Sequence, residues 1–198
     1  MPFTDTPGSA QAEPVEAPSA KHVIAFWQDA GPAQWFAHDP AFDSAIAERF
    51  SALHNSAACG ELADWGNHWE GSLALLLLLD QFPRNLFRGS AHSYATDALA
   101  RHLADAAIAV GHDGQAPAEL RVFYYLPFEH SEDLADQDRG LTLVQALDAT
   151  SGSEYTSWAA LHRDIVARFG RFPHRNAALG RISSAEELAY LAGGGFTG

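Results

Sequence analysis

The sequence has one cysteine, one methionine and few positive charges, and two of these shortages exclude whole classes of protein. Cys59 has no second cysteine with which to form an internal disulfide, so the chain is neither a disulfide scaffold nor a cysteine-rich metal protein. Lys and Arg total 12 against 25 Asp and Glu, which gives a formal net charge of −13. Because this charge repels polyanions, we expect no nucleic acid and no anionic membrane as partner.

Long apolar runs are also missing. The most apolar stretch, residues 73–79, is far shorter than the roughly 20 residues that span a bilayer, and Asp80 ends it. Residues 1–20 have no basic start and no apolar core, and the first arginine is Arg49. These features are not those of a secretory signal or a mitochondrial presequence. We therefore expect a soluble, cytoplasmic protein.

Length and composition predict one domain with short extensions. The 198 residues are 47% hydrophobic, which is enough to bury a sizeable core. Residues 1–19 are rich in Pro, Ala, Ser and Glu and predict a flexible N-terminal arm. Residues 20–192 form the predicted domain, and residues 193–198 a glycine-rich tail that we expect to fray.

Apolar residues recur at helical spacing along almost the whole domain. After the helix-start signal Asp39-Pro40, for example, Phe42, Ile46 and Phe50 follow one another at intervals of four. No segment shows the period-two alternation of a strand between turn residues. The sequence therefore predicts an all-α fold of about eight antiparallel helices packed as a compact bundle. Their expected ranges are 21–29, 40–59, 69–81, 91–110, 117–126, 132–147, 153–169 and 184–192.

Three polar motifs interrupt the apolar, alanine-rich sequence, at residues 80–85, 126–133 and 168–176. Each follows the C-terminal end of a predicted helix, the third, the fifth and the seventh. Alternate helices of an up-down bundle point the same way, so we expect these three ends to lie along one rim. The candidate ligand-binding side chains of this rim are Asp80, Arg84, Asn85, His130, Glu132, Arg168, Arg171, Arg175 and Asn176.

With these motifs the chain resembles a known family. The further matching pieces are Phe26-Trp27, Trp35-Phe36 and Asp39-Pro40-Ala41-Phe42-Asp43, and the likeness extends over residues 23–192. The sequence resembles the bacterial family of unknown function DUF924. The resemblance implies a TPR-like, all-helical fold and no established reaction.

Arginines gather near the C-terminus of this otherwise acidic protein. Between residues 163 and 181 the one local acid is Asp164. The arginines of this segment are Arg163, Arg168, Arg171, Arg175 and Arg181. Because guanidinium groups suit carboxylates and phosphates, the segment predicts a rim pocket for a small anionic molecule or an acidic peptide.

Two histidines and one carboxylate are candidates for catalysis at the same rim. Histidine side chains can transfer protons near neutral pH, which makes His130 and His174 candidates, and Glu132 is placed in sequence to orient or exchange a proton. An enzyme acting on an anionic substrate is therefore an alternative to a binding module. A third hypothesis is a helical scaffold in which the arginines and carboxylates only hold helices together.

The sequence predicts no metal and no other cofactor. Glu129, His130, Glu132 and Asp133 offer oxygen and nitrogen atoms, but no zinc-binding spacing such as HExxH occurs. The neighbouring arginines would also repel a cation. No nucleophilic-serine elbow and no phosphate-binding glycine loop is present either.

Overall fold

The computed structural model describes residues 19–198, and the N-terminal arm predicted for residues 1–19 lies, except for Ser19, outside the described residues. Every regular element in the described part is helical, as predicted, and the expected number of about eight helices is close to that observed. The α-helices are α1 (Ala20–Ala30), α2 (Pro32–Trp35), α3 (Pro40–Ala58), α4 (Trp69–Leu76), α5 (Phe82–Leu86), α6 (Asp97–Ala109), α7 (His112–Gln115), α8 (Leu126–Glu129), α9 (Leu134–Ser151), α10 (Thr156–Phe169) and α11 (Ala185–Ala192). Short 3₁₀ helices cover Ala63–Asn67, Ala91–Tyr94, Ala118–Tyr124 and Pro173–Arg175, and a π-helix covers Leu77–Gln81.

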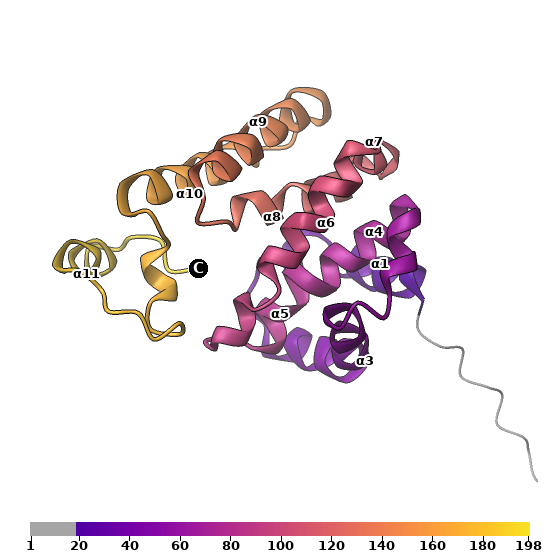
Figure 1. Ribbon diagram of the computed structural model, residues 1–198, viewed down its shortest axis with the longest axis horizontal. Coiled ribbons are helices and arrows are strands. Elements are labelled where there is room, and N and C mark those ends of the chain that lie inside the picture. Colours follow the sequence, from indigo (N-terminus) through magenta and orange to yellow (C-terminus); the bar gives the residue numbers. More distant parts are fainter. Residues whose placement is uncertain (1–18) are drawn as a thin grey trace, which may run out of the picture.

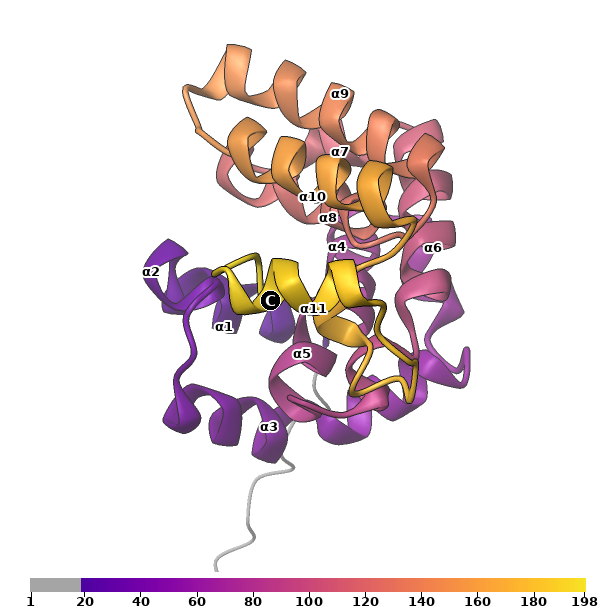
Figure 2. The same ribbon diagram turned by 90° about the vertical axis from the view of Figure 1, so that its left-hand side faces the viewer.

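The helices form layers that follow the order of the chain (Figure 1). Helices α9 and α10 pack against each other as a hairpin, α8 and α6 occupy the middle, and α1, α3, α4 and α5 lie on the far side. The C-terminal helix α11 sits beside the other layers near the end of α10 (Figure 2). This arrangement brings the polar ends of α5, α8 and α10 toward the same region.

Side chains fix the helix starts that the sequence predicts. The Asp39 carboxylate accepts a hydrogen bond from the Ala41 N–H at 2.8 Å, and Asp133 does the same for Ala135 at 2.8 Å. Ser184 begins α11 and exchanges hydrogen bonds with Glu187 as a capping box. Each cap satisfies backbone donors that the first turn of a helix leaves free.

The helices predicted after Ser90 and from residue 117 differ from those observed. The segment after Ser90 forms a 3₁₀ turn first, and α6 starts at Asp97. The range predicted as a helix from residue 117 is a 3₁₀ helix followed by the single turn α8, which accommodates Pro127 near its start. Proline fits there because the first turn of a helix needs no N–H from it.

The main core is built around the buried run 73–79 of α4 and the π-helix, and α1, α5 and the 3₁₀ helix before α8 add a group of aromatic rings. The ring of Trp27 lies 5.6 Å from that of Phe82 and 5.5 Å from that of Phe123, between ring centres. All three side chains are almost completely buried, and such aromatic pairs add to the stabilisation from apolar burial. None of the helices in residues 19–198 combines the length and apolar composition needed to cross a membrane.

A second, smaller apolar cluster stands apart from the main core. It is formed by Ile165, Val166 and Phe172, with Phe169, Tyr190 and Phe196 packed around them. Phe196, from the predicted glycine-rich tail, lies 4.6 Å from the His162 ring and 5.1 Å from the His174 ring, between ring centres. The C-terminal residues thus make their own cluster on the end of α10.

Candidate functional site

The helix that carries the first polar motif widens before Pro83. Residues Leu77–Gln81 are π-helical, and the Phe82 N–H bonds to the Leu77 carbonyl, five residues earlier. Proline has no N–H to give, and its ring clashes with the carbonyl four residues before it in a regular helix. The prediction that Pro83 ends this helix is wrong, because the wider turn absorbs the proline and the chain stays helical to Leu86. Such π segments frequently occur at functional sites.

Side chains from elsewhere satisfy the carbonyls of the widened turn. The Thr96 hydroxyl donates to the Leu79 carbonyl at 2.5 Å, which is the carbonyl that residue 83 would bond in a regular α-helix. His54 Nδ1 bonds to the Leu78 carbonyl at 2.8 Å. The buried backbone around Asp80 is therefore held in place from two sides.

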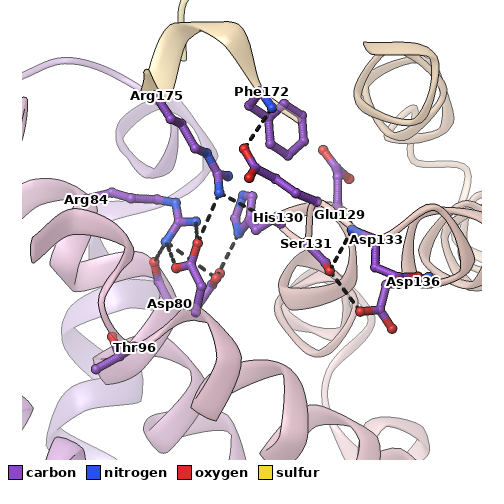
Figure 3. A network of polar contacts seen from close by, with 12 residues as sticks. Asp80, Arg84, Thr96, Glu129, His130, Ser131, Asp133, Asp136, Phe172 and Arg175 are labelled. Carbon is purple, nitrogen blue, oxygen red and sulfur yellow. Dashed lines mark hydrogen bonds and ion pairs between the residues drawn. The ribbon is translucent and has the colours of Figure 1, made fainter. Parts of the chain in front are cut away.

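Asp80 forms a buried pair with His130. His130 Nδ1 donates to Asp80 Oδ1 at 2.8 Å, and Asp80 is only 1% exposed (Figure 3). Gln81 and Arg84 also contact the Asp80 carboxylate. This pair joins the first polar motif to the second, as the rim hypothesis expects.

The charges at this pair are set by burial and by the neighbouring groups. Burial alone would raise the pKa of Asp80, but His130 and Arg84 outweigh it and hold that pKa well below its usual range. Burial, with Arg84 in addition, lowers the pKa of His130. At neutral pH Asp80 is therefore ionised and His130 neutral. Since Nδ1 carries the proton toward Asp80, Nε2 is left as a proton acceptor.

Asp97, which the sequence motifs do not include, is shared by two arginines. Arg84 donates to both its oxygens, at 3.1 and 3.2 Å, and Arg175 Nη1 donates to Oδ2 at 3.3 Å. Arg175 Nη1 also donates to the backbone carbonyl of His130 at 3.0 Å. Asp97 is the first residue of α6, and its position in sequence gave no sign of this role.

A cavity of about 310 Å³ opens beside these residues. Its walls come from α6 with the turn before it, from the end of α8 and the loop after it, and from the segment after α10. They are formed by Tyr94, Asp97, Ala98, Arg101, Pro127, His130, Ser131, Glu132, Arg175 and Leu179. Of the predicted residues, His130, Glu132 and Arg175 line the cavity. Asp80 and Arg84 do not line it, but Asp80 bonds to His130 and Arg84 bonds to Asp97.

Arg175 is the most unusual group of the cavity. Its guanidinium lies between two rings, 4.6 Å from the centre of Tyr94 and 4.4 Å from that of Phe172. The residue is only 6% exposed, and Nη1 makes both of its hydrogen bonds. Within the part of the chain that the structure describes, Nε and Nη2 have no hydrogen-bond partner, and Nε is buried. Burial, with Arg84 in addition, lowers the pKa of Arg175, as expected for a cation that is incompletely compensated.

Glu132 attaches the third motif to the second. Its Oε1 accepts from the Phe172 N–H at 2.8 Å, and Arg181 donates to both carboxylate oxygens, at 2.6 and 2.9 Å. Burial opposes these bonds, but they lower the pKa of Glu132 overall. The carboxylate is therefore a structural anchor as well as part of the cavity wall, which leaves it poorly suited to the proton transfer hypothesised for it.

Five predicted residues lie away from the cavity, and two of them are asparagines. Asn85 donates to Asp43 at 2.7 Å, on the side of α3. Asn176 is buried and bonds to Ser183 and Arg181 within its own segment. The Asn85 amide thus joins α5 to α3, and the Asn176 amide holds the segment after α10 together.

Arg168 and Arg171 are also outside the cavity. Arg168 pairs with Glu186 at 2.8 Å, and both side chains are exposed. Arg171 donates to both carboxylate oxygens of Glu187, at 2.6 and 2.8 Å. The arginines of residues 163–181 have one acid nearby in the sequence, as noted above, but α6, α9, α11 and the loop after α8 supply acidic partners from elsewhere in the chain.

His174 faces the C-terminal cluster. Its ring lies 5.6 Å from Phe172 and 5.1 Å from Phe196, between ring centres, and its buried Nδ1 has no hydrogen-bond partner among residues 19–198. Burial, and then Arg175, lowers the pKa of His174 to about 3. It is not a wall of the cavity, so of the two candidate histidines only His130 reaches it.

A second histidine–carboxylate pair lies behind the first and was not among the predicted residues. His162 Nδ1 is 2.8 Å from the Trp158 carbonyl and 2.9 Å from Glu129 Oε1, and the His162 ring centre is 6.5 Å from that of His130. His162 lies one turn after Trp158 on α10, and only the fold brings it beside Glu129. Among residues 19–198, no three His, Cys, Asp or Glu side chains are arranged to hold a metal ion.

The fold and the site define an all-helical protein with a cavity walled by a histidine, arginines and carboxylates. The chain belongs to the family described as "Bacterial protein of unknown function (DUF924)", whose model matches residues 23–195. It is also similar to a solved structure titled "Structure of Protein of Unknown Function ATU0120 from Agrobacterium tumefaciens". The two share 54% identity and a TM-score of 0.83, over 87% of this chain and 96% of that chain. No curated protein matches the sequence.

Proposed function

We propose that the cavity binds a small anionic molecule through Arg175. The observation that carries this proposal is the state of that guanidinium: it is buried, it lines the cavity, and Nε and Nη2 have no partner in the described part of the chain. A buried donor without a partner costs free energy, and more when it is charged. A carboxylate or phosphate in the cavity would accept from this group and repay that cost.

The surroundings of Arg175 favour binding over a purely structural role. Asp97 already receives two hydrogen bonds from Arg84, so it compensates Arg175 only in part. Tyr94 and Phe172 hold the guanidinium plane between their rings, which limits its motion and fixes the direction of its free donors. The binding group is thus preorganised.

The proposal is tested by isothermal titration calorimetry at low salt with acetate, citrate, phosphate and sulfate. We expect at least one of these anions to bind in a one-to-one ratio, with an affinity that falls as salt is added. Arg175→Gln should abolish binding and Arg175→Lys weaken it, since lysine lacks the planar fork. Arg168→Gln is the matched control, because it removes an arginine whose partner, Glu186, is exposed and far from the cavity walls.

Two outcomes would reject the proposal. One is the absence of binding by every anion to the wild-type protein, which would favour a scaffold. The other is binding that Arg175→Gln leaves unchanged. A short peptide with an acidic C-terminus is included in the titrations, and tighter binding of this peptide than of any small anion would assign the cavity to a peptide ligand instead.

A second candidate function is acid–base catalysis by His130 on the bound anion. The Asp80–His130 bond of 2.8 Å favours it, because an aspartate on Nδ1 orients the ring and leaves Nε2 free to take a proton. If the protein is an enzyme, turnover found in a metabolite panel should be lost in His130→Asn. The control, His174→Asn, changes a histidine outside the cavity and should retain the activity.

A further inference from the structure

Positively and negatively charged side chains surround His130 in nearly equal number. The charged and titratable groups that face it are Asp80 from the π segment, Arg84 from α5, Asp97 from α6, Arg175 from the segment after α10, His162 from α10 and Glu129 from its own helix. Two arginines thus oppose two aspartates next to the cavity, and behind them His162 Nδ1 lies 2.9 Å from Glu129 Oε1. An anion that entered alone would add a negative charge to the two arginines and two aspartates and leave them with an excess negative charge.

The cavity walls select against a second negative charge on the ligand. Asp97 and Glu132 line the same space as Arg175, and the other arginine of the walls, Arg101, is already paired with Asp136 at 3.3 Å. A dianion bound to Arg175 would therefore face two carboxylates as well. A carboxylate brings one charge and two oxygens in a plane, which match the fork of a guanidinium. The apolar side of the cavity, with Pro127 and Leu179, accepts a short apolar body attached to that carboxylate.

His130 is placed to restore the charge balance. Its ring lines the cavity next to Arg175, whose Nη1 bonds to the His130 carbonyl at 3.0 Å (Figure 3). Nδ1 is fixed on Asp80, whereas Nε2 has no hydrogen-bond partner among residues 19–198. A negative charge close to a histidine favours its protonated form, so a bound anion would draw a proton onto Nε2. That proton comes from hydronium or a buffer acid in the solvent: its bond to the donor breaks, an N–H bond forms at Nε2, and the bound anion itself is not altered.

We infer that the cavity takes up a singly charged carboxylate together with one proton, which His130 accepts at Nε2. This inference rests on the proposed function, since it specifies the class of anion and the manner of its binding. It predicts that carboxylates bind more tightly than sulfate. It also predicts that affinity falls about tenfold for each unit by which the pH rises, over the pH range in which binding is accompanied by the uptake of one proton.

The experiment measures proton uptake directly. Acetate, propionate and benzoate are titrated into the full-length protein in two buffers with different enthalpies of ionisation, between about pH 5 and pH 8, where histidines change charge. The difference in binding enthalpy between the buffers counts the protons taken up. For the wild type we expect a value approaching one per carboxylate bound, and a weaker affinity for sulfate.

His130→Asn provides the decisive comparison, because the Asn amide still donates to Asp80 but accepts no proton. We expect it to bind carboxylates more weakly at low pH, with no proton uptake and little dependence on pH. His130→Gln is the second variant, and circular dichroism confirms that each is folded. The matched control His102→Asn changes an exposed histidine on α6 and should behave as the wild type.

The outcomes separate this inference from the proposed function. Carboxylate binding that depends on Arg175 but brings no proton overturns the inference and leaves the proposed function standing. Tighter binding of sulfate than of every carboxylate does the same. Proton uptake that persists in both His130 variants also overturns it, because another group then takes the proton. If no anion binds the wild type at all, the proposed function itself is wrong.

Discussion

Pro83 and Thr96 act on the same carbonyl group. Pro83 cannot donate a hydrogen bond to Leu79, four residues before it, and the Thr96 hydroxyl donates to that carbonyl at 2.5 Å. The site therefore depends on a proline that opens the helix and on a threonine, from the turn before α6, that satisfies the carbonyl exposed by the opening. Asp80 occupies the widened turn between them.

Thr96→Val should destabilise the protein. The substitution removes the hydroxyl and leaves the buried Leu79 carbonyl without this partner, which costs about 1–3 kcal/mol of unfolding free energy. Urea unfolding measures the change. Thr142→Val is the control, because the Thr142 hydroxyl bonds within an exposed turn of α9, at 2.9 Å to Asp138 O. Equal effects of the two substitutions would contradict the role given to Thr96.

Asp80→Asn should be among the most destabilising single changes. It removes the charge from a buried carboxylate that contacts His130 and Arg84, and breaking such a pair costs about 3–5 kcal/mol. Because the pKa of Asp80 is lowered on folding, this contribution is complete above about pH 4, near the pKa of an unfolded aspartate, and is lost as the pH falls further. Urea unfolding at several pH values should show the wild-type advantage shrinking in acid.

Asp105→Asn is the control for that experiment. Asp105 pairs with Arg139 at 2.8 Å, but both side chains are largely exposed. We expect a change of less than about 1 kcal/mol, as for other surface pairs. A loss at Asp80 no larger than that at Asp105 would show that the buried pair does not stabilise the fold.

His174→Phe should make stability less sensitive to acid. In the folded protein burial lowers the pKa of His174 to about 3, whereas in the unfolded chain the ring titrates near its ordinary value of about 6.5. Between these values the unfolded state binds the proton and the folded state does not, so stability falls as the pH falls, by at most about 1.4 kcal/mol per pH unit. Phenylalanine fits beside Phe172 and Phe196 and removes this dependence. Thermal unfolding between about pH 4 and pH 7 tests this, and an unchanged slope would refute it.

Arg171→Gln should lower the unfolding temperature more than Arg168→Gln. Arg171 bonds to both oxygens of Glu187, a residue only 3% exposed, and lowers its pKa to about 2. Without the guanidinium this buried carboxylate still accepts the hydrogen bond of the Ser184 N–H, at 2.7 Å, but loses both bonds from Arg171. Arg168 instead pairs with an exposed partner. The reverse order of the two unfolding temperatures would contradict the contacts described.

We predicted the meeting of the three motifs from helix order, and the structure brings Asp80, His130, Glu132 and Arg175 together, although Asp80 lies within a continuing helix and not at its end. The ion pairs of the arginines could not be predicted from the sequence, since their acidic partners come from distant segments that no local pattern reveals. Asp97, for example, lies 78 residues before Arg175 in the sequence. The same limit applies to Pro83, because whether a proline ends a helix or widens it depends on a donor such as Thr96 that the fold supplies.

The cavity walls lie far apart along the chain, and this has a consequence for synthesis. Tyr94 and Asp97 come from the middle of the sequence, whereas Arg175 and Leu179 come from a segment that Arg181 anchors to Glu132. A nascent chain that still has residue 181 inside the ribosome has therefore made α6 and α8 but has no closed cavity. Any ligand of this cavity meets the protein only after translation of its C-terminal segment and cannot guide the folding of the helices made before it.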